Sequence, residues 1–379
     1  MPNFPIDKVD LQCTLNGRNL LELCSRISVA ESIHSTFPTT SVEIPHDGAY
    51  EMQEALAGQK LNLSIRGASG SALTVNHVVH SAKPGLHQAG RALTGVINGV
   101  SPDYPNAVKE RVTKGWSKKN ADQIIQEIHK EGLKSKFPLE VSSGMKQASM
   151  TSPSLLPLKA IEKAHKLSGT GSRAFYFQTT ENGGKAHCKT MKDLTKQGPK
   201  KSFTYKSTGA ADPNSIYDPT TVYDAHYEGS PVSAQKHTQA QGMNYNPSYG
   251  KTGKNEKAGQ GLSTPGLGVQ SGQANVAYPV INSIEQNKEK RHFDRDQQSL
   301  NDYTAKLKLL VPIQTDLHAG DVINFNSGSA TMFSDANPNN SVSGKWLVAS
   351  VIHTVETGGK EGTPHHTGRT LIHCIGKIS

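Results

Sequence analysis

The fold of this chain is decided by the stretch Gly344-Lys-Trp-Leu-Val-Ala-Ser-Val-Ile-His-Thr-Val-Glu356 near its end. The stretch is rich in β-branched residues and alternates apolar with polar positions, which predicts a β-strand. Two strand-like segments precede it, Tyr303–Pro312 and Leu317–Phe325, and the second of these contains a Gly-Asp turn. A third strand-like segment, Gly368–Ile375, follows it. We therefore predict a compact β-unit over residues 301–379. No set of residues in this unit has a catalytic pattern, which indicates a structural element.

The composition is that of a polar, turn-rich protein. The chain has 379 residues, enough for about two or three domains. Only 34% of the residues are hydrophobic, the mean hydropathy is −0.53, and there are 35 Gly and 20 Pro. A large doubly wound parallel sheet is not expected, because its buried strands need continuous apolar runs, which are few here.

The first hundred residues also have a strand period. Val9, Leu11, Cys13 and Leu15 share one face before an Asn16-Gly17 turn, which is a strong hairpin signal. Further strands are predicted at Cys24–Ala30, Ser41–Ile44, Leu61–Ile65, Ala72–His80 and Arg91–Gly99, with a short helix at Asp47–Ala57. We predict an antiparallel β-domain with one helix over residues 1–102.

The period changes over residues 103–204. Amphipathic helices are predicted at Asn120–His129 and at Ser154–Leu167, where Pro157 falls in the first turn. The turn Glu181-Asn-Gly-Gly184 then separates two further strands, at Arg173–Thr179 and Lys185–Met191. This segment is predicted to be a separate α+β domain.

The positive charge of the chain is concentrated in that domain. The formal net charge is +9, and the stretch from Asp103 to Lys206 holds 20 Lys and Arg against 9 Asp and Glu. That stretch carries about +11, and the rest of the chain about −2. A solvated face is one interpretation, and an acidic partner, whether nucleic acid, phosphate or protein, is the other. Aromatic residues are sparse there, so a stacking platform for single strands is not predicted.

The remaining segment is unusual in composition. A strand is predicted at Thr221–Glu228, and we assign 215–228 together with 301–379 to a second β-unit. Residues 229–300 are predicted to form a long polar loop, Gly229–Ala277, and a charged helix, Ile281–Leu300, because few large apolar side chains are available for burial. The predicted fold class is thus α+β and mainly antiparallel β, with two similar β-units and an α+β domain between them.

No cofactor or metal site is predicted. The four cysteines are far apart and form no C-x-x-C pair: Cys13, Cys24, Cys188 and Cys374. His353 and His373 could meet if their strands pair, with His365 and His366 close in sequence, but no pattern supplies a third ligand. Structural histidines are the preferred interpretation, and a metal site near the C-terminus stays open.

No catalytic residues are predicted either. The chain contains no nucleophile elbow, P-loop or dinucleotide fingerprint, and the glycine-rich Gly261–Gly268 lacks the flanking strand and helix of a phosphate site. Glycoside hydrolysis needs two carboxyl groups across a cleft. The sequence offers no reason to choose a pair among Glu22, Glu43, Glu51 and Glu54. Asp321 is interpreted as a turn residue that opens a strand.

Targeting signals are not predicted. The segment Met1–Asp7 has neither a basic n-region nor an apolar core, so we expect no secretory signal. No apolar run approaches the roughly 18 residues of a membrane helix, so we expect no membrane insertion. The isolated cysteines lead us to expect a reducing compartment.

Three features carry a resemblance to a known family. The first is the helix Leu158-Lys-Ala-Ile-Glu-Lys-Ala-His-Lys-Leu167 followed by the aromatic strand Arg173-Ala-Phe-Tyr-Phe-Gln178. The second is the segment Leu317–Ile323 ahead of Trp346–Glu356, and the third is the order of the modules. In these the chain resembles the central baseplate-hub proteins of contractile-tailed bacteriophages and, more distantly, the hub part of type VI secretion spike proteins. The polar segment Gly229–Ala277 matches nothing in the family.

The resemblance implies a non-enzymatic structural role. Each subunit of such a hub has two tail-tube-like β-barrel domains, so a homotrimer presents six similar units around a central channel and joins a sixfold tube to a threefold spike. The implied partners are the tail tube or a tube-initiator protein, the spike and the surrounding baseplate proteins, with DNA only in transit. The implied location is the virion tail baseplate, assembled in the cytoplasm of the bacterial host. A cell-wall hydrolase with a structural domain and a basic nucleic-acid-binding protein are the alternatives.

Overall fold

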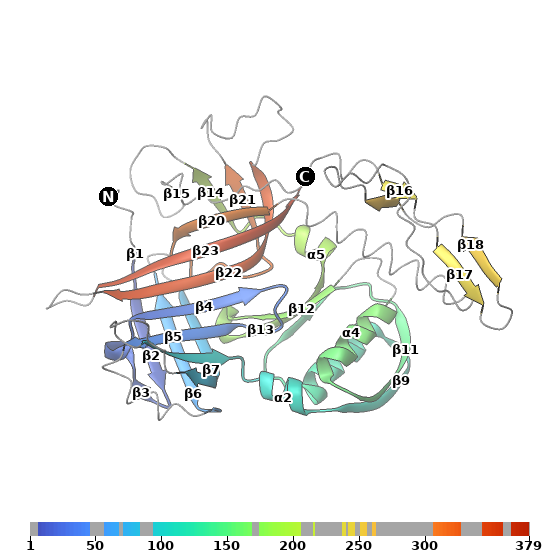
Figure 1. Ribbon diagram of the computed structural model, residues 1–379, viewed down its shortest axis with the longest axis horizontal. Coiled ribbons are helices and arrows are strands. Elements are labelled where there is room, and N and C mark those ends of the chain that lie inside the picture. Colours follow the sequence, from blue (N-terminus) through green and yellow to red (C-terminus); the bar gives the residue numbers. More distant parts are fainter. Residues whose placement is uncertain are drawn as a thin grey trace.

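The described part of the chain contains one large β-sheet (Figure 1). The structure is a computed structural model. It describes residues 7–45, 57–67, 71–83, 94–168, 174–205, 215–216, 237–239, 242–246, 251–255, 260–262, 306–326, 343–358 and 365–378. The largest sheet has 14 strands and is mixed, since the strand at Lys201–Tyr205 joins its neighbours in parallel whereas the other pairs are antiparallel. The mainly antiparallel α+β class is therefore confirmed.

The N-terminal region forms one end of this sheet. Its elements are β1 (Asp7–Lys8), β2 (Asp10–Leu15), β3 (Arg18–Asn19), η1 (Leu21–Leu23), β4 (Arg26–Ser32), β5 (Thr39–Pro45), β6 (Lys60–Arg66), β7 (Ala72–Lys83) and β8 (Thr94–Val100). The strands lie in the order β4-β5-β8-β7-β6-β2-β3. Buried and exposed residues alternate along β2, β4 and β6, as the strand period predicts. The helix predicted at Asp47–Ala57 lies almost entirely outside the described residues.

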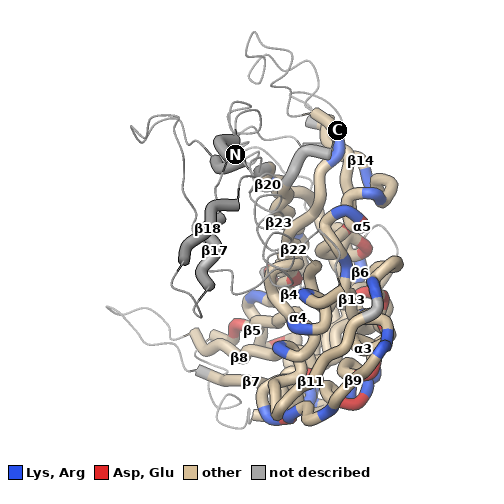
Figure 2. The backbone as a smooth tube through the Cα atoms, turned by 90° about the vertical axis from the view of Figure 1, so that its right-hand side faces the viewer, with Lys and Arg blue, Asp and Glu red and all other residues tan. Residues whose placement is uncertain are grey.

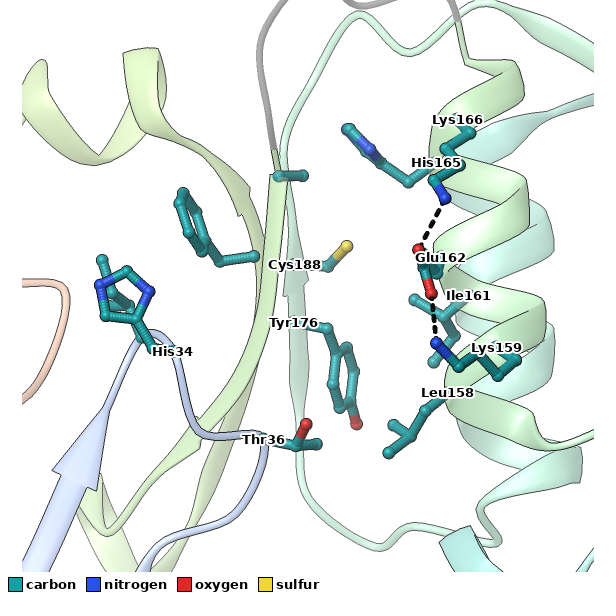
Figure 3. Close-up of a pocket in the computed structure, with 13 residues that line it drawn as sticks. His34, Thr36, Leu158, Lys159, Ile161, Glu162, His165, Lys166, Tyr176 and Cys188 are labelled. Atoms are coloured by element: carbon teal, nitrogen blue, oxygen red, sulfur yellow. Dashed lines mark hydrogen bonds and ion pairs between the residues drawn. The ribbon is translucent and has the colours of Figure 1, made fainter. Parts of the chain in front are cut away.

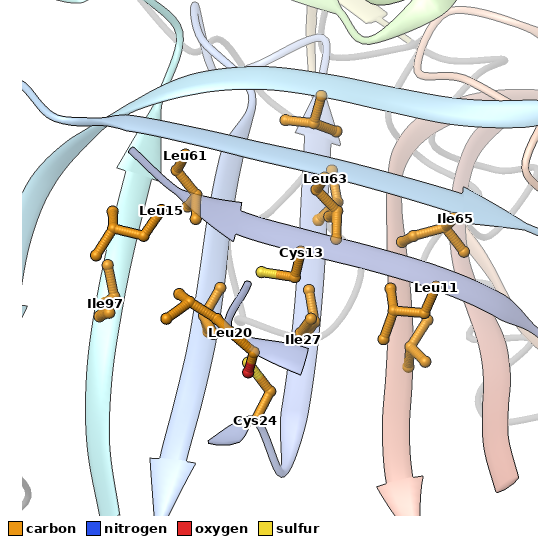
Figure 4. Close-up of a cluster of buried hydrophobic side chains, with 14 of the residues drawn as sticks. Leu11, Cys13, Leu15, Leu20, Cys24, Ile27, Leu61, Leu63, Ile65 and Ile97 are labelled. Atoms are coloured by element: carbon orange, nitrogen blue, oxygen red, sulfur yellow. The ribbon is translucent and has the colours of Figure 1, made fainter. Parts of the chain in front are cut away.

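The buried faces of these strands form one apolar cluster (Figure 4). Figure 4 shows Leu11, Cys13 and Leu15 on β2 pointing to the same side as Leu61 and Ile65 on the neighbouring β6. The cysteines of this region lie within the cluster as small apolar residues. A hydrogen bond with Cys13 and burial both raise the pKa of the Cys24 thiol, so it stays protonated and unreactive.

The predicted turn at Asn16-Gly17 connects β2 to β3. Both residues have positive φ, 54° at Asn16 and 89° at Gly17. A two-residue hairpin turn of this kind matches the right-handed twist of the strands, and only glycine takes up such a φ without steric cost.

We expect Gly17→Ala to lower the free energy of unfolding by roughly 1–2 kcal/mol, the cost of a left-handed conformation for an L-residue. A methyl group at Gly17 would meet no atom within 4 Å, so the effect is one of backbone conformation alone. Gly198→Ala is the matched control, because that position is equally open and no positive φ is found there. Urea unfolding of both variants measures the difference, and equal stabilities would contradict the expectation.

The central α+β module packs beside the large sheet. Its elements are α2 (Tyr104–Lys109), β9 (Val112–Asn120), α3 (Ala121–Glu127), η3 (Ile128–Gly132), β10 (Leu139–Val141), β11 (Gln147–Leu155), α4 (Pro157–Leu167), β12 (Ala174–Thr179), η4 (Glu181–Gly183), β13 (Lys185–Thr190) and α5 (Met191–Thr195). Both predicted helices and the predicted hairpin are present, and Pro157 begins α4. The pairing of β9 with β11 was missed, because β9 is mostly exposed and carries no apolar alternation.

The C-terminal region supplies the longest strands. It contains β20 (Lys306–Pro312), β21 (Val322–Asn326), β22 (Gly344–Gly358) and β23 (His365–Ile378), and β14 (Lys201–Tyr205) and β15 (Ser215–Ile216) extend its edge. Four short strands form two antiparallel pairs in the segment expected to be only a polar loop: β16 (His237–Gln239) with β19 (Gln260–Leu262), and β17 (Gly242–Asn246) with β18 (Lys251–Asn255). The predicted strand Thr221–Glu228 and helix Ile281–Leu300 lie outside the described residues.

Strand pairing joins the two β-regions at two places, between β22 and β4 and between β1 and β23. The first residues of β22 pair with β21, and the segment Ser350–Glu356 pairs with β4 from Ser32 back to Arg26. The other edge of β22 pairs with β23, which in turn pairs with β20 and with β1. The N-terminal and C-terminal regions are therefore continuous through the contact of β22 with β4. No closed barrel is found among the described residues, so two separate tube-like barrels remain a proposal.

Candidate functional site

The α+β module presents a lysine-rich face. In Figure 2 Lys and Arg positions lie along β9, α3, β13 and α5, with acidic positions among them. Lys130, Lys136, Lys192 and Lys196 are exposed, and none of them forms an ion pair within the described part of the chain. A surface of this kind attracts acidic partners over a distance set by the ionic strength.

The carboxylates of this face are already neutralised by lysines. The Glu127 carboxylate forms ion pairs with Lys114, at 3.2 Å, and with Lys119. It also accepts a hydrogen bond from the indole N–H of Trp116 at 2.8 Å. Lys189 lies 2.7 Å from Glu140, with Lys185 at 3.2 Å. The excess positive charge of the module is therefore left on its surface and available to a partner.

A groove of about 690 Å³ lies between α4 and the edge of β12 (Figure 3). Leu158 and Ile161 of α4 form one wall, and Glu162 on the same helix is held between Lys159 at 3.0 Å and Lys166 at 2.7 Å. In Figure 3, Tyr176 and Cys188 point toward α4, and the turn with His34 and Thr36 lies on the opposite side of the strand. The groove thus has an apolar wall with a charged rim, open along the edge of a strand.

Tyr176 is held rigidly on the floor of this groove. Its hydroxyl lies 2.9 Å from Nδ1 of His129, whose Nε2 lies 2.9 Å from the carbonyl oxygen of Phe137. Because the carbonyl can only accept, Nε2 of His129 donates to it, which fixes the orientation of the ring beside Tyr176. Burial raises the pKa of Tyr176, so the ring is neutral and its role is structural.

A buried charge cluster connects the three regions of the chain. Glu31 on β4 is completely buried, and its carboxylate lies 3.2 Å from Nδ1 of His318 in the loop before β21. The same carboxylate accepts the backbone N–H of Thr180 at 2.7 Å and of Ala319 at 3.2 Å, and also the Thr180 hydroxyl. One side chain of the N-terminal region thus binds both the α+β module and the C-terminal region. We call Glu31, Thr180, His318 and Ala319 the junction.

In the junction, Glu31 and His318 each stabilise the charged form of the other. Burial by itself would raise the pKa of Glu31, but the charge of His318 and the hydrogen bonds from His318 and Thr180 outweigh it and lower the pKa to about 2. Burial likewise opposes the charge on His318, yet the adjacent Glu31 raises the pKa of that imidazole. Removing one partner would leave the other charge buried without compensation, which is costly.

Gly320 lets the junction loop approach the α+β module. Its φ is +90°, and a Cβ at this position would lie 2.8 Å from Cζ of Phe177 on β12. Asp321 then accepts the backbone N–H of His318 at 2.8 Å and an ammonium hydrogen of Lys200 at 3.0 Å. Asp321 directly precedes β21, the position that its interpretation as a strand-opening turn residue predicts.

The candidate metal-binding histidines do not come together. The strands β22 and β23 pair as the two-histidine hypothesis requires, but His353 lies opposite Thr370 and His373 opposite Ser350. The two histidines are three positions apart in this register, so they fall on opposite faces of the sheet. His353 is buried beside Thr370, 3.1 Å away, and burial lowers its pKa to about 4. Within the described residues, no group of three or more His, Cys, Asp or Glu side chains could hold a metal ion.

The other residues considered from sequence do not form a site. Glu22 is exposed in η1, Glu43 makes a 4.0 Å contact with Arg26, and Glu51 and Glu54 lie outside the described residues. The important carboxylate, Glu31, was missed. Its signal is present in the sequence, because it occupies a buried position in the alternation of β4 between Val29 and Ile33. A charged residue in an apolar register must find a partner, and only the tertiary structure identifies that partner as His318.

No helix of the described residues is long and apolar enough to span a membrane.

The described elements match those of solved tail proteins. The tail protein from Neisseria meningitidis MC58 superposes with a TM-score of 0.58 at 8% identity, over 97% of this chain and 96% of that chain. The 43 kDa tail protein of prophage MuSo2 from Shewanella oneidensis gives a TM-score of 0.58 at 11% identity, over 96% and 97%. No protein-family model and no curated protein sequence matches the chain. The chain thus has the fold of tail proteins, in agreement with the baseplate-hub resemblance expected from its sequence.

Proposed function

We infer that this protein is the structural hub of a phage tail baseplate. In this proposal, residues 1–102 and residues 215–228 with 301–379 act as two tube-like β-domains, and residues 103–204 form a domain inserted between them. Three subunits form a ring with a central channel, which joins a sixfold tail tube to a threefold spike. The protein acts without catalysis, and its location is the baseplate of the virion, assembled in the bacterial cytoplasm.

The observation that carries the proposal is the contact of β22 with β4. It places the two β-regions of one chain side by side in a continuous sheet, from Ser350↔Ser32 to Glu356↔Arg26. Two such regions per subunit give six in a trimer, which is the number a sixfold tube requires. A cyclic trimer uses contacts between unlike surfaces that close on themselves, and strand edges left free in a monomer could be covered in such a ring. The fold shared with solved tail proteins supports the same assignment.

The proposed partners follow from the same arrangement. The tail tube or a tube-initiator protein binds one end of the ring and the spike binds the other, while DNA passes through the channel only in transit. The lysine-rich face of residues 103–204 lies at the periphery and contacts acidic surfaces of surrounding baseplate proteins. The near-neutral charge of the β-regions supports a channel along which DNA slides without binding.

Oligomeric state tests the hub assignment. We expect the purified chain, alone or with its cognate spike, to have the mass of a trimer by light scattering and to form a threefold ring with a pore in negative-stain images. Trimer formation can require the spike as a template, so a monomer observed without the spike does not decide the question. A compact monomer that stays monomeric with the spike, or cleavage of cell walls that one carboxylate substitution abolishes, would overturn the assignment.

Reversal of exposed lysines tests the peripheral contact. We expect the combined substitutions Lys130→Glu, Lys136→Glu, Lys192→Glu and Lys196→Glu to reduce incorporation into baseplates at least tenfold, without a change in thermal stability. The reason is that these ammonium groups have no ion-pair partners within the described residues and face solvent. Baseplate yield in a complementation assay measures the effect. Normal assembly with lost, salt-dependent DNA binding would instead support the nucleic-acid alternative.

A further inference from the structure

The edge of β12 has open backbone hydrogen-bonding groups inside the groove beside α4. β12 is the outer strand of a three-stranded sheet in the order β10-β13-β12. Its register with β13 is regular, with Ala174 opposite Thr190, Tyr176 opposite Cys188 and Gln178 opposite Ala186. In an antiparallel pair, every second residue directs both its N–H and its C=O away from the neighbouring strand.

One hydrogen bond identifies which residues point outward. The N–H of Gln178 donates to the carbonyl oxygen of Thr36 at 2.9 Å, on the side away from β13. By the same alternation, the N–H and C=O groups of Tyr176 and Ala174 also point outward. No backbone partner for either residue is found in the described part of the chain. An open edge of this kind is a template for another strand.

The chain begins to cover this edge and then turns away. Thr36 makes the single bond to Gln178, whereas Ile33 donates instead to the carbonyl oxygen of Ala349 in β22, at 2.9 Å. The turn between them diverges from β12 and opens the groove of about 690 Å³ at Tyr176 and Ala174. This volume is within the range of ligand pockets, roughly 300–1,000 Å³. The outward groups repeat every second residue, about 6.8 Å apart, which matches an extended chain and not a helix.

The charge of the groove indicates the chemistry of its occupant. Lys159 and Lys166 on the rim share the single carboxylate of Glu162, so the rim has a net positive charge, and it belongs to a module with about +11. Below the rim, Leu158 and Ile161 present an apolar wall. An added strand would place alternate side chains toward this wall, with the ammonium groups in reach of neighbouring carboxylates.

We propose that the groove between α4 and β12 binds an extended, acidic segment of a neighbouring tail protein, which adds to the edge of β12 as a further strand. The inference rests on the proposed contact of residues 103–204 with surrounding tail proteins, and it assigns that contact a place and a mode. The backbone groups of Ala174 and Tyr176 provide the strand pairing, and Lys159 and Lys166 select for carboxylates.

Peptide binding to the full chain tests this site. The probe is a fluorescein-labelled peptide of alternating Val and Glu, compared with an alternating Val and Lys peptide and with a Val and Glu peptide N-methylated at alternate residues. We expect fluorescence anisotropy to show binding of the first peptide at least tenfold tighter than of either comparison peptide. N-methylation removes the donors of one edge and leaves the charge unchanged, so it separates strand pairing from electrostatic attraction.

Matched variants locate the site on the chain. Ala174→Pro removes an outward N–H that β13 does not use, a change that edge strands tolerate, and Ala174→Ser retains that N–H. We expect tenfold weaker binding for Ala174→Pro and for Lys159→Glu with Lys166→Glu. Binding should be unchanged for Ala174→Ser and for Lys8→Glu with Lys60→Glu, two exposed lysines outside residues 103–204 whose reversal alters the net charge equally. Thermal unfolding verifies that each variant is folded.

The outcomes of the peptide-binding test decide whether the groove is a binding site, independently of the hub assignment. Equal binding of all three peptides, no binding, or equal weakening by both lysine pairs would overturn the proposal. Because the measurement needs no ring, its failure in a chain that still forms a trimer with its spike would overturn only this site. Peptide binding by a chain that never trimerises would keep the site and reject the hub.

Discussion

Glu31→Gln is expected to lower the free energy of unfolding by about 3–5 kcal/mol, the usual cost of breaking a buried ion pair from one side. The amide keeps the shape of the carboxylate, so the loss comes from charge and hydrogen bonding and not from a cavity. Its NH₂ group would face donors where Glu31 now accepts from Thr180 and Ala319, and the charge of His318 would lose its partner. Urea unfolding followed by circular dichroism measures the change.

The matched control for this prediction is Glu43→Gln. Glu43 is partly exposed and meets Arg26 at only 4.0 Å, so an effect within about 1 kcal/mol is expected. The double variant Glu31→Gln with His318→Gln should cost less than the sum of the two single variants, because removal of both charges leaves none uncompensated. If the Glu31 and Glu43 variants were equally stable, the junction would not hold the three regions together.

Acid is expected to unfold this protein well above the pKa of ordinary carboxylates. Burial lowers the pKa of His77, His187 and His353 from 6.5 to about 4. The unfolded chain therefore binds more protons than the folded chain between pH 6.5 and 4, and stability falls as the pH falls through this window. Each histidine contributes on the order of 3 kcal/mol to the loss.

The two charged groups of the junction make stability depend on pH in opposite directions. Glu31 extends the loss of stability to lower pH, and His318 causes a loss of stability as the pH rises. Because the pKa of Glu31 is lowered to about 2, its contribution is complete above 4.5 and is lost as the pH falls from there toward 2. The pKa of His318 is raised by Glu31 despite its burial, so its contribution is complete below 6.5 and is lost as the pH rises through the folded-state value. Stability should therefore be greatest near neutral pH.

Urea unfolding at a series of pH values between 8 and 4 measures this dependence. His353→Asn provides the test of origin, since the amide can still bond to Thr370 but takes up no proton. We expect the free energy of unfolding of the variant to depend less steeply on pH, by a slope that corresponds to about one proton fewer taken up on unfolding. A pH-independent free energy of unfolding over this range, or a variant with the same slope as the parent chain, would contradict the assignment.

The secondary structure was largely predictable wherever burial follows a regular period. The strands around Leu61–Ile65 and the helix at Asn120–His129 were expected because their apolar residues recur at two or at 3.6 residues, and both are found. β9 was not expected, since it pairs on a mostly exposed surface and has no such period. The continuity of the two β-regions was also missed, because pairing between β4 and β22 depends on contacts more than 300 residues apart.

The sequence by itself determined the β-rich class, the helices near Asn120–His129 and Ser154–Leu167, the Asn16-Gly17 turn and the concentration of lysines. These depend on local periodicity, on the φ preference of glycine and on composition, all of which are properties of neighbouring residues. Only the tertiary structure decided that Glu31 meets Thr180 and His318, and that β12 has no partner strand beside α4 among the described residues. The reason is physical: a buried charge and a strand edge are each defined by what lies opposite them, and the chain reaches that place only after folding.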